Sequence, residues 1–420
     1  MDLLADLDAR GLIQDSTDRH ALAEALAWGQ VTLYHGVDPT ADSLHTGNLI
    51  GLVMLRRFLD AGHHPIALAG GATGMIGDPG GRSSERNLLD EATLEGNVAA
   101  ISAEINRVLG PGGWTLVNNA DWTRDVRLLD FLRDVGKHAT VNQMVARESV
   151  KQRMAGQDGI SFTEFSYMLL QAFDYQHLYD EQGCTLQIGG SDQWGNILSG
   201  VELIRRTRGA SVHALSWPLL TAADGSKLGK STGARVWLDP AKTSPYELFQ
   251  HWLRTDDADV DRLLRWFTLL DVGAIDELVA THARDPGRRL AQRALAEHVT
   301  ALVHGADEAA RAAAASTTAF APVLDAESLR ALEGELPTTW LPDDAPDRKL
   351  TALLAEVGLA RSRTAATKLI EQRGAYLNDE VVTDPDTVVG RSARREGRWV
   401  LLRAGKKQRH LLVYEPPVES

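Results

Sequence analysis

The first half of the chain alternates short apolar segments with longer segments of helical periodicity. This alternation of strand-like and helix-like segments favours a parallel sheet with helices on both faces. In such sheets ligands bind beyond the carboxyl ends of the strands, in loops that are often rich in glycine. We expect strands at 31–36, 65–69, 115–118 and 185–188, and helices at 47–61, 94–109, 162–180 and 193–206.

The chain has 420 residues, more than one hydrophobic core usually serves, so we expect several domains. Residues 1–235 are predicted to form a Rossmann-like α/β domain. Strand signals vanish beyond it, which predicts an all-helical domain over 236–335. Three prolines mark 336–347 as a linker. Two helical segments followed by a hairpin pattern predict a small α+β domain over 348–414.

Positive charge is concentrated near the end of the sequence. Residues 347–414 carry 14 Lys and Arg against 8 Asp and Glu, a net +6, although the whole chain has a net charge of −13. A small basic module beside an acidic body is typical of RNA binding, although an ordinary solvated surface can show the same bias. We therefore expect the last domain to contact RNA.

The sequence carries one cysteine, Cys184, and no zinc-binding spacing. One thiol cannot form an internal disulfide, so we expect a reducing compartment and a buried Cys184 rather than a nucleophile. Residues 1–12 lack the basic and apolar regions of a signal peptide, and the most apolar stretch, 66–76, is too short to span a bilayer. We expect a cytoplasmic protein that does not insert into membranes.

One motif, His45-Thr-Gly47-Asn48, stands at the expected start of a helix. A helix N-terminus offers free backbone N–H groups and the positive end of the helix dipole, which suit an anion such as triphosphate. His45 and Asn48 lie on one face of the first turn, and Gly47 would let an adenine or ribose approach the backbone. A histidine that merely caps an ordinary helix would give the same pattern.

A second motif, Lys227-Leu-Gly-Lys230-Ser231, lies in a glycine-flanked segment after the last expected β/α unit. Two lysines three residues apart can close on phosphate oxygens from one side. Taken alone, the motif is equally typical of a charged surface loop.

Together, in this order, the two motifs resemble the HIGH and KMSKS motifs of the class I aminoacyl-tRNA synthetases. The fourth HIGH position is Asn48 instead of histidine, and KMSKS is replaced by K-L-G-K-S. Asn48 can still donate a neutral hydrogen bond, but it cannot carry a proton.

Four further stretches, 34–45, 70–79, 160–174 and 186–196, resemble the bacterial-type tyrosyl-tRNA synthetases, and the basic tail resembles an S4-like RNA-binding module. The resemblance covers nearly the whole chain. It implies ATP-dependent ligation of L-tyrosine to tRNA-Tyr in two steps. Tyrosyl-adenylate forms first with release of pyrophosphate, and the acyl group then passes to the 3′ end of the tRNA.

A phenol requires a donor and an acceptor at the bottom of its pocket, and Tyr34 and Asp174 resemble the family's pair for that oxygen. Phenylalanine would leave both groups buried and unpaired, which is costly. Asp78, Tyr167 and Gln171 resemble the family's acceptors for the substrate ammonium group. Without the resemblance, Tyr167 would be read as a core residue and Asp78 as a turn former before proline.

By this resemblance the catalytic set comprises His45, Asn48, Lys227, Lys230, Arg82 and Arg86, the tyrosine-binding set Tyr34, Asp78, Tyr167, Gln171, Asp174 and Gln193, and the ATP-binding set Gly36, Asp38, Thr40, His45, Gly47, Asn48, Gly190, Asp192 and Lys230. His35 stands at a position that the family often uses near the ribose. Mg²⁺ is expected to accompany ATP, and we find no dedicated metal site in the sequence.

The resemblance also implies a homodimer, formed through an insertion near 119–162, with tRNA spanning both subunits. The expected partners are therefore a second copy, tRNA-Tyr, L-tyrosine and ATP. Basic residues near the insertion are candidates for contacts with acceptor-stem phosphates. They are Arg147, Lys151, Arg153, Arg205, Arg206 and Arg208.

Three other interpretations remain at this point. Gly71-Ala-Thr-Gly74-Met-Ile-Gly77 follows a strand and could belong to an NAD(P)-dependent reductase. It follows the second strand instead of the first, Asp-Pro comes next, and the chain lacks a Tyr-x-x-x-Lys pair. A non-catalytic RNA-binding protein is disfavoured by the intact His45 and lysine motifs, and a tryptophan-specific relative by Tyr34 and Asp174.

Overall fold

The computed structural model describes residues 2–78, 89–156, 159–221, 235–319, 325–405 and 408–415. Their contacts form two compact units. The first comprises Met1–Thr243 and Trp252–Val303, and the second comprises Ser244–His251 and His304–Ser420. The helical region that we expected over 236–335 is therefore divided between the two units.

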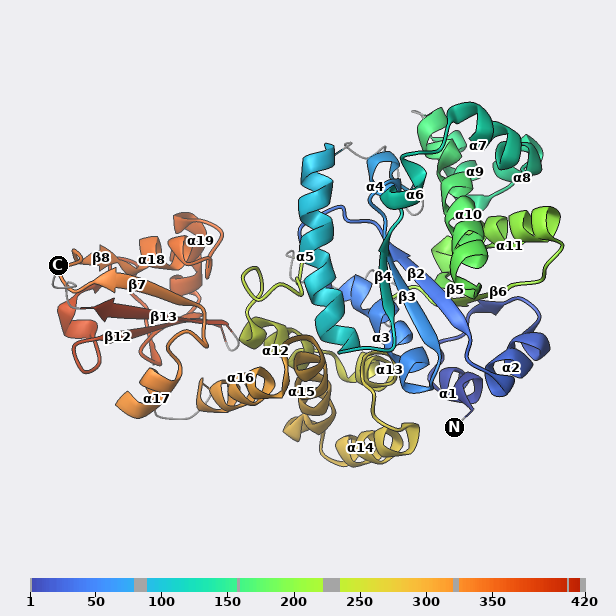
Figure 1. Cartoon of the computed structure of the whole chain (residues 1–420). Coiled ribbons are helices and arrows are strands. Elements are labelled where there is room, and N and C mark those ends of the chain that lie inside the picture. The colour runs from blue at the N-terminus through green and yellow to red at the C-terminus, as the bar shows by residue number, and fades with distance from the viewer. Residues whose placement is uncertain are drawn as a thin grey trace. The chain divides into compact units, whose positions relative to one another are not determined.

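The first unit contains a six-stranded sheet with the order β1-β6-β5-β2-β3-β4 (Figure 1). Strands β2 to β6 are parallel, and β1 pairs with the edge strand β6 in the antiparallel direction. This confirms the α/β, Rossmann-like fold. The strands are β1 (Asp15–Ser16), β2 (Thr32–Val37), β3 (His64–Ala69), β4 (Thr115–Asn118), β5 (Cys184–Gly190) and β6 (His213–Trp217).

Helices cover both faces of this sheet (Figure 1). The chain runs through β2, β3 and β4 toward one edge, and then returns to place β5 and β6 on the other side of β2. Right-handed crossovers therefore put α3 (Thr46–Asp60) and α5 (Glu91–Leu109) on one face and α11 (Trp194–Arg208) on the other, where it packs against α10 (Phe162–Gln182). The order reverses between β2 and β5, which is where open α/β sheets bind ligands.

Several helices of the first unit were not expected from the sequence. Two precede the sheet, a short one follows β3, and a series of short helices fills the segment between β4 and α10 (Figure 1). They are α1 (Leu3–Ala9), α2 (Arg19–Trp28), α4 (Thr73–Ile76), α6 (Ala120–Thr123), α7 (Leu128–Asp134), α8 (Val141–Val145) and α9 (Glu148–Ala155), with the 3₁₀ turns η1 (Gly136–His138) and η2 (Ser191–Gln193).

The helical character expected after residue 244 is confirmed. Apolar side chains at helical spacing are buried along these helices, as in α15, where Leu295, Val299 and Val303 face the core. The helices are α12 (Pro245–Leu253), α13 (Asp257–Phe267), α14 (Val272–Arg284), α15 (Leu290–His304), α16 (Ala306–Ala319) and α17 (Ala326–Ala331), with η4 (Pro286–Arg288).

The second unit ends in a five-stranded sheet with the order β10-β9-β12-β13-β7 and a two-stranded sheet of β8 and β11. The expected hairpin is β12 (Trp399–Ala404) and β13 (Gln408–Glu415), and the expected helices are α18 (Leu350–Glu356) and α19 (Arg363–Glu371). The other elements are β7 (Thr338–Pro342), β8 (Arg348–Lys349), β9 (Ala375–Leu377), β10 (Glu380–Val381), β11 (Val388–Val389) and η5 (Arg391–Ala393).

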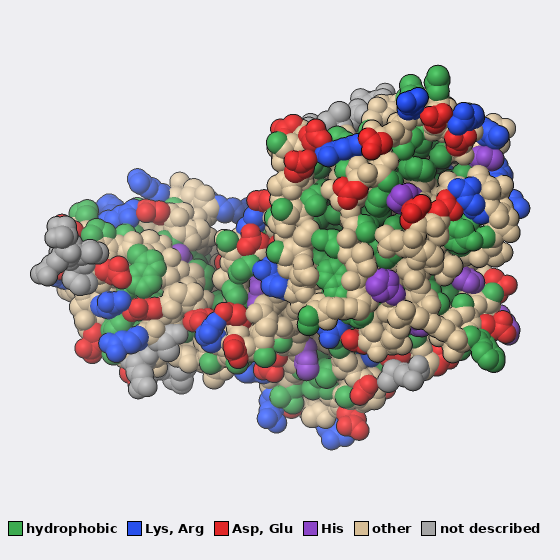
Figure 2. Space-filling model, in the orientation of Figure 1, with side chains coloured by type: hydrophobic (Ala, Val, Ile, Leu, Met, Phe, Trp, Pro, Cys, Tyr) green, Lys and Arg blue, Asp and Glu red, His purple; other side chains and the backbone are tan. Residues whose placement is uncertain are grey.

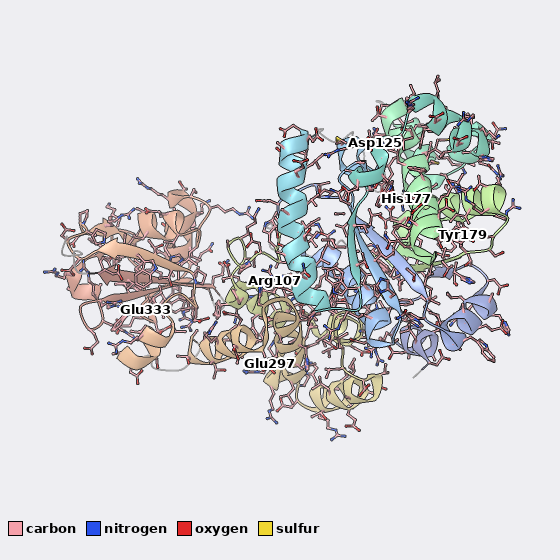
Figure 3. The ribbon with its side chains drawn as sticks, viewed as in Figure 1. Arg107, Asp125, His177, Tyr179, Glu297 and Glu333 are labelled. Carbon is pink, nitrogen blue, oxygen red and sulfur yellow. The ribbon has the colours of Figure 1, made fainter. Side chains whose placement is uncertain are left out.

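The linker predicted over 336–347 is wrong for its central part. Residues 338–342 form β7, which pairs in parallel with β13 over its whole length. The prolines misled the prediction because β7 is an edge strand, where a missing N–H is tolerated. Glu333, labelled in Figure 3, accepts hydrogen bonds from Arg398 and from the Trp399 indole, so the segment before β7 is also attached to this sheet.

Cys184 is buried, as expected, at the start of β5. None of the helices in the described part of the chain combines the length and the hydrophobicity that a membrane span requires.

The crossing of α3 over β2 depends on a glycine. A Cβ atom on Gly51 of α3 would lie 2.2 Å from Nε2 of His35 on β2. We expect Gly51→Ala to lower the free energy of unfolding by about 1–3 kcal/mol, because the enclosed ring cannot move away freely. Gly96→Ala in α5 is the control: no atom lies within 4 Å of its Cβ position, so we expect it to stabilise by about 0.5–1 kcal/mol. Equal urea midpoints for both variants would contradict this account of the packing.

Candidate active site

A cavity of about 360 Å³ opens where the order of the sheet reverses, at the carboxyl ends of β2 and β5. Its walls also come from the start of α3 and from α10. All the predicted site residues that the structure describes line it: Tyr34, Gly36, Asp38, Thr40, His45, Gly47, Asn48, Asp78, Tyr167, Gln171, Asp174, Gly190, Asp192 and Gln193. The other four, Arg82, Arg86, Lys227 and Lys230, lie outside the described residues.

The floor of the cavity holds the two groups expected to read a phenol. Tyr34 on β2 is 1% exposed and Asp174 on α10 is 3% exposed. The Tyr34 hydroxyl donates a long hydrogen bond of 3.5 Å to the backbone oxygen of Gln171, and the Tyr34 ring packs at 5.4 Å from that of Tyr175. One hydroxyl donor and one carboxylate acceptor therefore face the same enclosed space.

Asp174 is held by two residues that the sequence analysis did not identify. Asn119 Nδ2 donates to Asp174 Oδ2 at 2.9 Å, and Trp122 Nε1 donates to Oδ1 at 2.9 Å. The Trp122 indole stacks on the imidazole of His177, one turn along α10 from Asp174 and labelled in Figure 3. Asn119 and Trp122 follow closely after the strand expected at 115–118. A position just beyond the carboxyl end of a strand is the sequence feature that could have identified them as site residues.

Burial controls the ionisation of both floor residues. It raises the pKa of Asp174 to about 7, although the hydrogen bonds from Asn119 and Trp122 favour the carboxylate and limit the rise. Burial, aided by the charge of Asp174, raises the pKa of Tyr34 well above its usual value. Tyr34 therefore remains a hydroxyl donor at neutral pH, while Asp174 is close to its titration point.

Acceptors gather beside the floor, on the side of β2 and α4. The Tyr167 hydroxyl donates to Asp38 Oδ2 at 3.0 Å, and the Gln193 side-chain amide donates to Asp78. Gln171 lies one turn from Tyr167 on α10, and its Oε1 is buried with no hydrogen-bond partner among the described residues. Carboxylates and an unsatisfied amide oxygen suit a cationic ammonium group.

Asp38 has a structural task as well. Its Oδ1 accepts a hydrogen bond of 2.9 Å from Thr73, and Thr73 in turn accepts one of 3.1 Å from Asn119. A Cβ on Gly70 would lie 2.4 Å from both Asp38 Oδ1 and Thr73 Oγ1, so the loop after β3 needs glycine at this position. These hydrogen bonds connect Asp38, which we expected near the ribose, to the Asn119 amide that also donates to Asp174.

At the start of α3, His45 and Asn48 cap the helix reciprocally. His45 Nδ1 accepts a hydrogen bond from the Gly47 N–H at 3.0 Å, and Asn48 Oδ1 accepts one from the His45 N–H at 3.1 Å. A Cβ on Gly47 would lie 2.9 Å from the His45 ring, so glycine makes room for the imidazole. Helix capping alone therefore explains why asparagine stands at position 48 and glycine at position 47, without any contact to a nucleotide.

The expectation of free backbone N–H groups at this helix end is wrong for its first three residues. The Thr46 N–H donates to Val236 O at 3.0 Å, the Gly47 N–H to His45 Nδ1, and the Asn48 N–H to His45 O at 2.8 Å. The donors that remain are on side chains. Burial, together with the charge of Arg235, lowers the pKa of His45, so its ring is neutral and carries its proton on Nε2.

His35 is enclosed on several sides. Its Nδ1 lies 3.3 Å from Ile188 O, and its ring meets that of Trp217 edge-on with centroids 5.2 Å apart. Loss of hydration lowers the pKa of His35 to about 4, so the ring is neutral at physiological pH. It lines the cavity near the carboxyl end of β2, consistent with a neutral hydrogen-bonding group.

The arginines proposed to meet tRNA phosphates differ in their availability. Arg153 is 5% exposed and pairs at 2.6 Å with the buried Glu164, so it is a structural residue and not a surface contact. Arg205 and Arg206 both pair with Glu202, and Arg208 pairs with Asp180. The remaining two candidates, Arg147 and Lys151, form no ion pair with a carboxylate among the described side chains; the Arg147 guanidinium donates to Ser199 at 3.3 Å.

Asp174 should make the stability of the protein depend on pH. The pKa of Asp174 is about 7 in the folded protein, against 3.8 for an ordinary aspartate, so unfolding releases a proton between these values and the free energy of unfolding falls as pH rises. From pH 5 to pH 7 the wild-type protein should lose about 2 kcal/mol relative to Asp174→Asn. Urea unfolding at each pH measures this difference, and parallel profiles for the two proteins would refute it.

Comparison with known proteins places these residues in a family. The family described as tRNA synthetases class I (W and Y) matches residues 28–321, and the tyrosine–tRNA ligase SYY-like C-terminal domain matches residues 329–412. The tyrosine–tRNA ligase of Acidothermus cellulolyticus is 48% identical over 415 residues, covering 96% of this chain and 97% of that protein. The tyrosine–tRNA ligase of Bacillus caldotenax is 47% identical over 422 residues, covering 99% and 100%.

Among solved structures, a C-terminally truncated mitochondrial tyrosyl-tRNA synthetase of Aspergillus nidulans is similar, with a TM-score of 0.68 and 34% identity over 76% of this chain and 94% of that one. The matched families, the full-length relatives and the shared fold agree with one another. The chain therefore belongs to the tyrosine–tRNA ligase family of the class I tRNA synthetases.

Proposed function

We propose that the cavity activates L-tyrosine with ATP and that the tyrosyl group then passes from the adenylate to a hydroxyl at the 3′ end of tRNA-Tyr, with AMP as the leaving group. The observation that carries the proposal is the buried pair of Tyr34 and Asp174 in a cavity that opens toward the start of α3. Tyr34 donates a hydrogen bond to the phenol oxygen, and Asp174 accepts one from the phenol hydroxyl. Phenylalanine would leave both groups unpaired at a cost of about 1–3 kcal/mol for each group.

The remaining polar groups set the orientation of tyrosine. Its ammonium group lies against Asp78, Tyr167 and the free Oε1 of Gln171, and its carboxylate points toward the side chains at the start of α3. Gly36, Asp38, Thr40, Gly190 and Asp192 surround the adenosine. This arrangement supplies proximity and orientation, which are the main sources of rate when no enzyme nucleophile takes part.

In the first step a carboxylate oxygen of tyrosine attacks the α-phosphorus of ATP. The bond from that phosphorus to the α,β-bridging oxygen breaks, and its electron pair leaves with pyrophosphate. His45, through its Nε2 proton, and Asn48, through its amide, donate to the phosphates. By resemblance, Lys227, Lys230, Arg82 and Arg86 stabilise the leaving group as its charge grows.

Mg²⁺ would enter with ATP and neutralise part of the phosphate charge. Three carboxylates of the cavity already accept hydrogen bonds from neighbouring side chains: Asp38 from Tyr167 and Thr73, Asp78 from Gln193, and Asp174 from Asn119 and Trp122. The phosphates themselves are therefore the expected ligands of the ion. The protein's own contribution is to hold the triphosphate in place.

The parts outside the cavity fit the partners expected of this family. Residues 348–414, the expected S4-like domain, would contact tRNA through their basic side chains, as would the helices of the preceding region. Residues 119–162 would form the dimer interface, because several of their apolar side chains are exposed around α7 (Figure 2). They are Leu128, Leu129, Leu132, Val141, Met154 and Phe162. We place the protein in the cytoplasm, where its tRNA substrate is found.

The substrate assignment can be tested by exchange of pyrophosphate into ATP with each of the twenty amino acids. Tyrosine alone should support exchange, and Tyr34→Phe should reduce the preference for tyrosine over phenylalanine about tenfold, the effect of one hydrogen bond. Tyr175→Phe is a matched control, because its hydroxyl donates to His213 O behind the Tyr34 ring and does not line the cavity. Exchange supported by another amino acid, or equal selectivity loss in both variants, would refute the assignment.

The dimer proposal predicts that a charge at the exposed apolar surface will produce monomers. Phe162 is 76% exposed and begins α10, the helix that also carries Tyr167 and Asp174. Phe162→Asp should halve the mass measured by light scattering, because burying an unpaired carboxylate at an interface is costly. Trp28→Asp, at an apolar residue on α2 that is 86% exposed, should leave the mass unchanged. A wild-type monomer would contradict the proposal.

A further inference from the structure

A short strand-like pairing holds residues 235–238 against the start of α3. The Thr46 N–H donates to Val236 O at 3.0 Å, the Leu238 N–H donates to Leu44 O at 2.8 Å, and Trp237 forms an antiparallel bridge with His45. This pairing places Arg235 at the mouth of the cavity, where it lines the wall together with His45, Gly47 and Asn48.

Arg235 is positioned by an aromatic ring. Its guanidinium carbon lies 5.3 Å from the centroid of the Trp237 ring, within the range of a cation–π contact. The Trp237 ring lies 6.3 Å from the ring of His45, and the positive charge of Arg235 helps to lower the pKa of that histidine. The guanidinium, the indole and the imidazole thus form one cluster beside the helix end.

The same ring carries a second cation that provides a contrast. Lys242 Nζ lies 5.2 Å from the centroid of Trp237, but it also pairs with Asp42 and does not line the cavity. Arg235 has no ion pair with any carboxylate of the described ranges, and it is the only Lys or Arg among the described residues that line the cavity. Its charge is therefore available to a ligand, whereas that of Lys242 is already compensated.

The described side chains at the start of α3 carry no positive charge that could meet a phosphate. The first three backbone N–H groups of α3 donate within the protein, His45 is neutral, and Asn48 uses its side-chain oxygen for the cap. Among the described residues, only neutral donors and Arg235 would meet a triphosphate in a cavity that also contains four aspartates, Asp38, Asp78, Asp174 and Asp192. The other expected cations, Lys227, Lys230, Arg82 and Arg86, lie outside the described residues. A permanent positive charge at the mouth would offset this repulsion.

We propose that Arg235 is a further catalytic residue of adenylate formation, which contacts the β- and γ-phosphates of ATP and stabilises the pyrophosphate that leaves. The inference rests on the proposed function. As the tyrosine carboxylate bonds to the α-phosphorus and the α,β-bridging bond breaks, negative charge moves onto pyrophosphate, where the planar guanidinium donates two hydrogen bonds. Trp237 is a positioning residue that holds the guanidinium toward the phosphates.

The test is the rate of tyrosyl-adenylate formation, followed by rapid quench at saturating ATP and tyrosine. Arg235→Ala should slow this step about 10- to 100-fold, the effect of losing a hydrogen bond to a charged group, and should leave the Kd for tyrosine within about twofold. Arg235→Lys should restore part of the rate. Lys242→Ala, which removes the other cation on the same ring, is the matched control and should react at the wild-type rate.

Trp237→Phe keeps an aromatic face and should retain most of the rate, whereas Trp237→Leu should lower it. Combining Trp237→Leu with Arg235→Ala should give no further loss, because the ring acts through the guanidinium. Unchanged tyrosine binding by equilibrium dialysis shows that each variant is folded.

If wild-type protein forms no tyrosyl-adenylate, the proposed function fails. If wild type forms it and Arg235→Ala matches its rate within twofold at every ATP concentration, only the role of Arg235 is overturned. An equal loss in Lys242→Ala would likewise overturn it, because the effect would then come from the ring and not from a phosphate contact.

Discussion

Asp174 is buried, and the hydrogen bonds from Asn119 and Trp122 offset part of the free energy needed to bury its charge. Even with both donors in position, burial raises the pKa of Asp174 to about 7, and loss of either donor would favour the neutral form further. Because both donors must stay in position, the loop after β4 is held at a fixed place relative to α10. The same requirement also fixes the wall between them, since Asn119 further donates to Thr73, which holds Asp38. Selectivity for a phenol and the shape of the cavity therefore have a common physical origin.

The buried polar groups at the start of α3 also need hydrogen-bond partners, and they find them in a different way. A buried helix end must find partners for its first N–H groups, and here the strand-like segment 235–238 and the reciprocal His45–Asn48 cap provide them. The consequence is a rigid terminus that no longer offers its backbone to an anion. What it offers instead is a set of oriented side chains: the Nε2 proton of His45 and the amide of Asn48. The substitution of asparagine for the second histidine of the family motif is compatible with this arrangement, because a side-chain oxygen can complete the cap.

Apolar periodicity predicted four of the six strands of the sheet that carries the site, β2 to β5. The segment 115–118 matched β4 at both ends, and the loops after β2 and β5 met as expected because parallel strands bring their carboxyl ends to one edge. Strand β6 was missed because His213 and Ser216 interrupt its apolar run, and β7 was taken for a linker because prolines are tolerated at a sheet edge. Asn119 and Trp122 could not be assigned roles, since their hydrogen bonds reach Asp174, more than fifty residues away. Arg235 was overlooked because its place beside His45 exists only after the segment pairs with α3.

The way in which a cation is held determines whether it remains useful to a ligand. A salt bridge, such as that of Lys242 with Asp42, fixes a side chain but cancels most of its field. An aromatic face fixes a guanidinium through the ring quadrupole and leaves its net charge and its N–H groups intact. At the mouth of this cavity, where four aspartates already repel a polyanion, the second mode preserves the attraction that the first would cancel. The side chain at position 235 is thus more than a surface charge beside a helix end: the Trp237 ring allows it to be ordered before ATP arrives and still fully charged when pyrophosphate leaves.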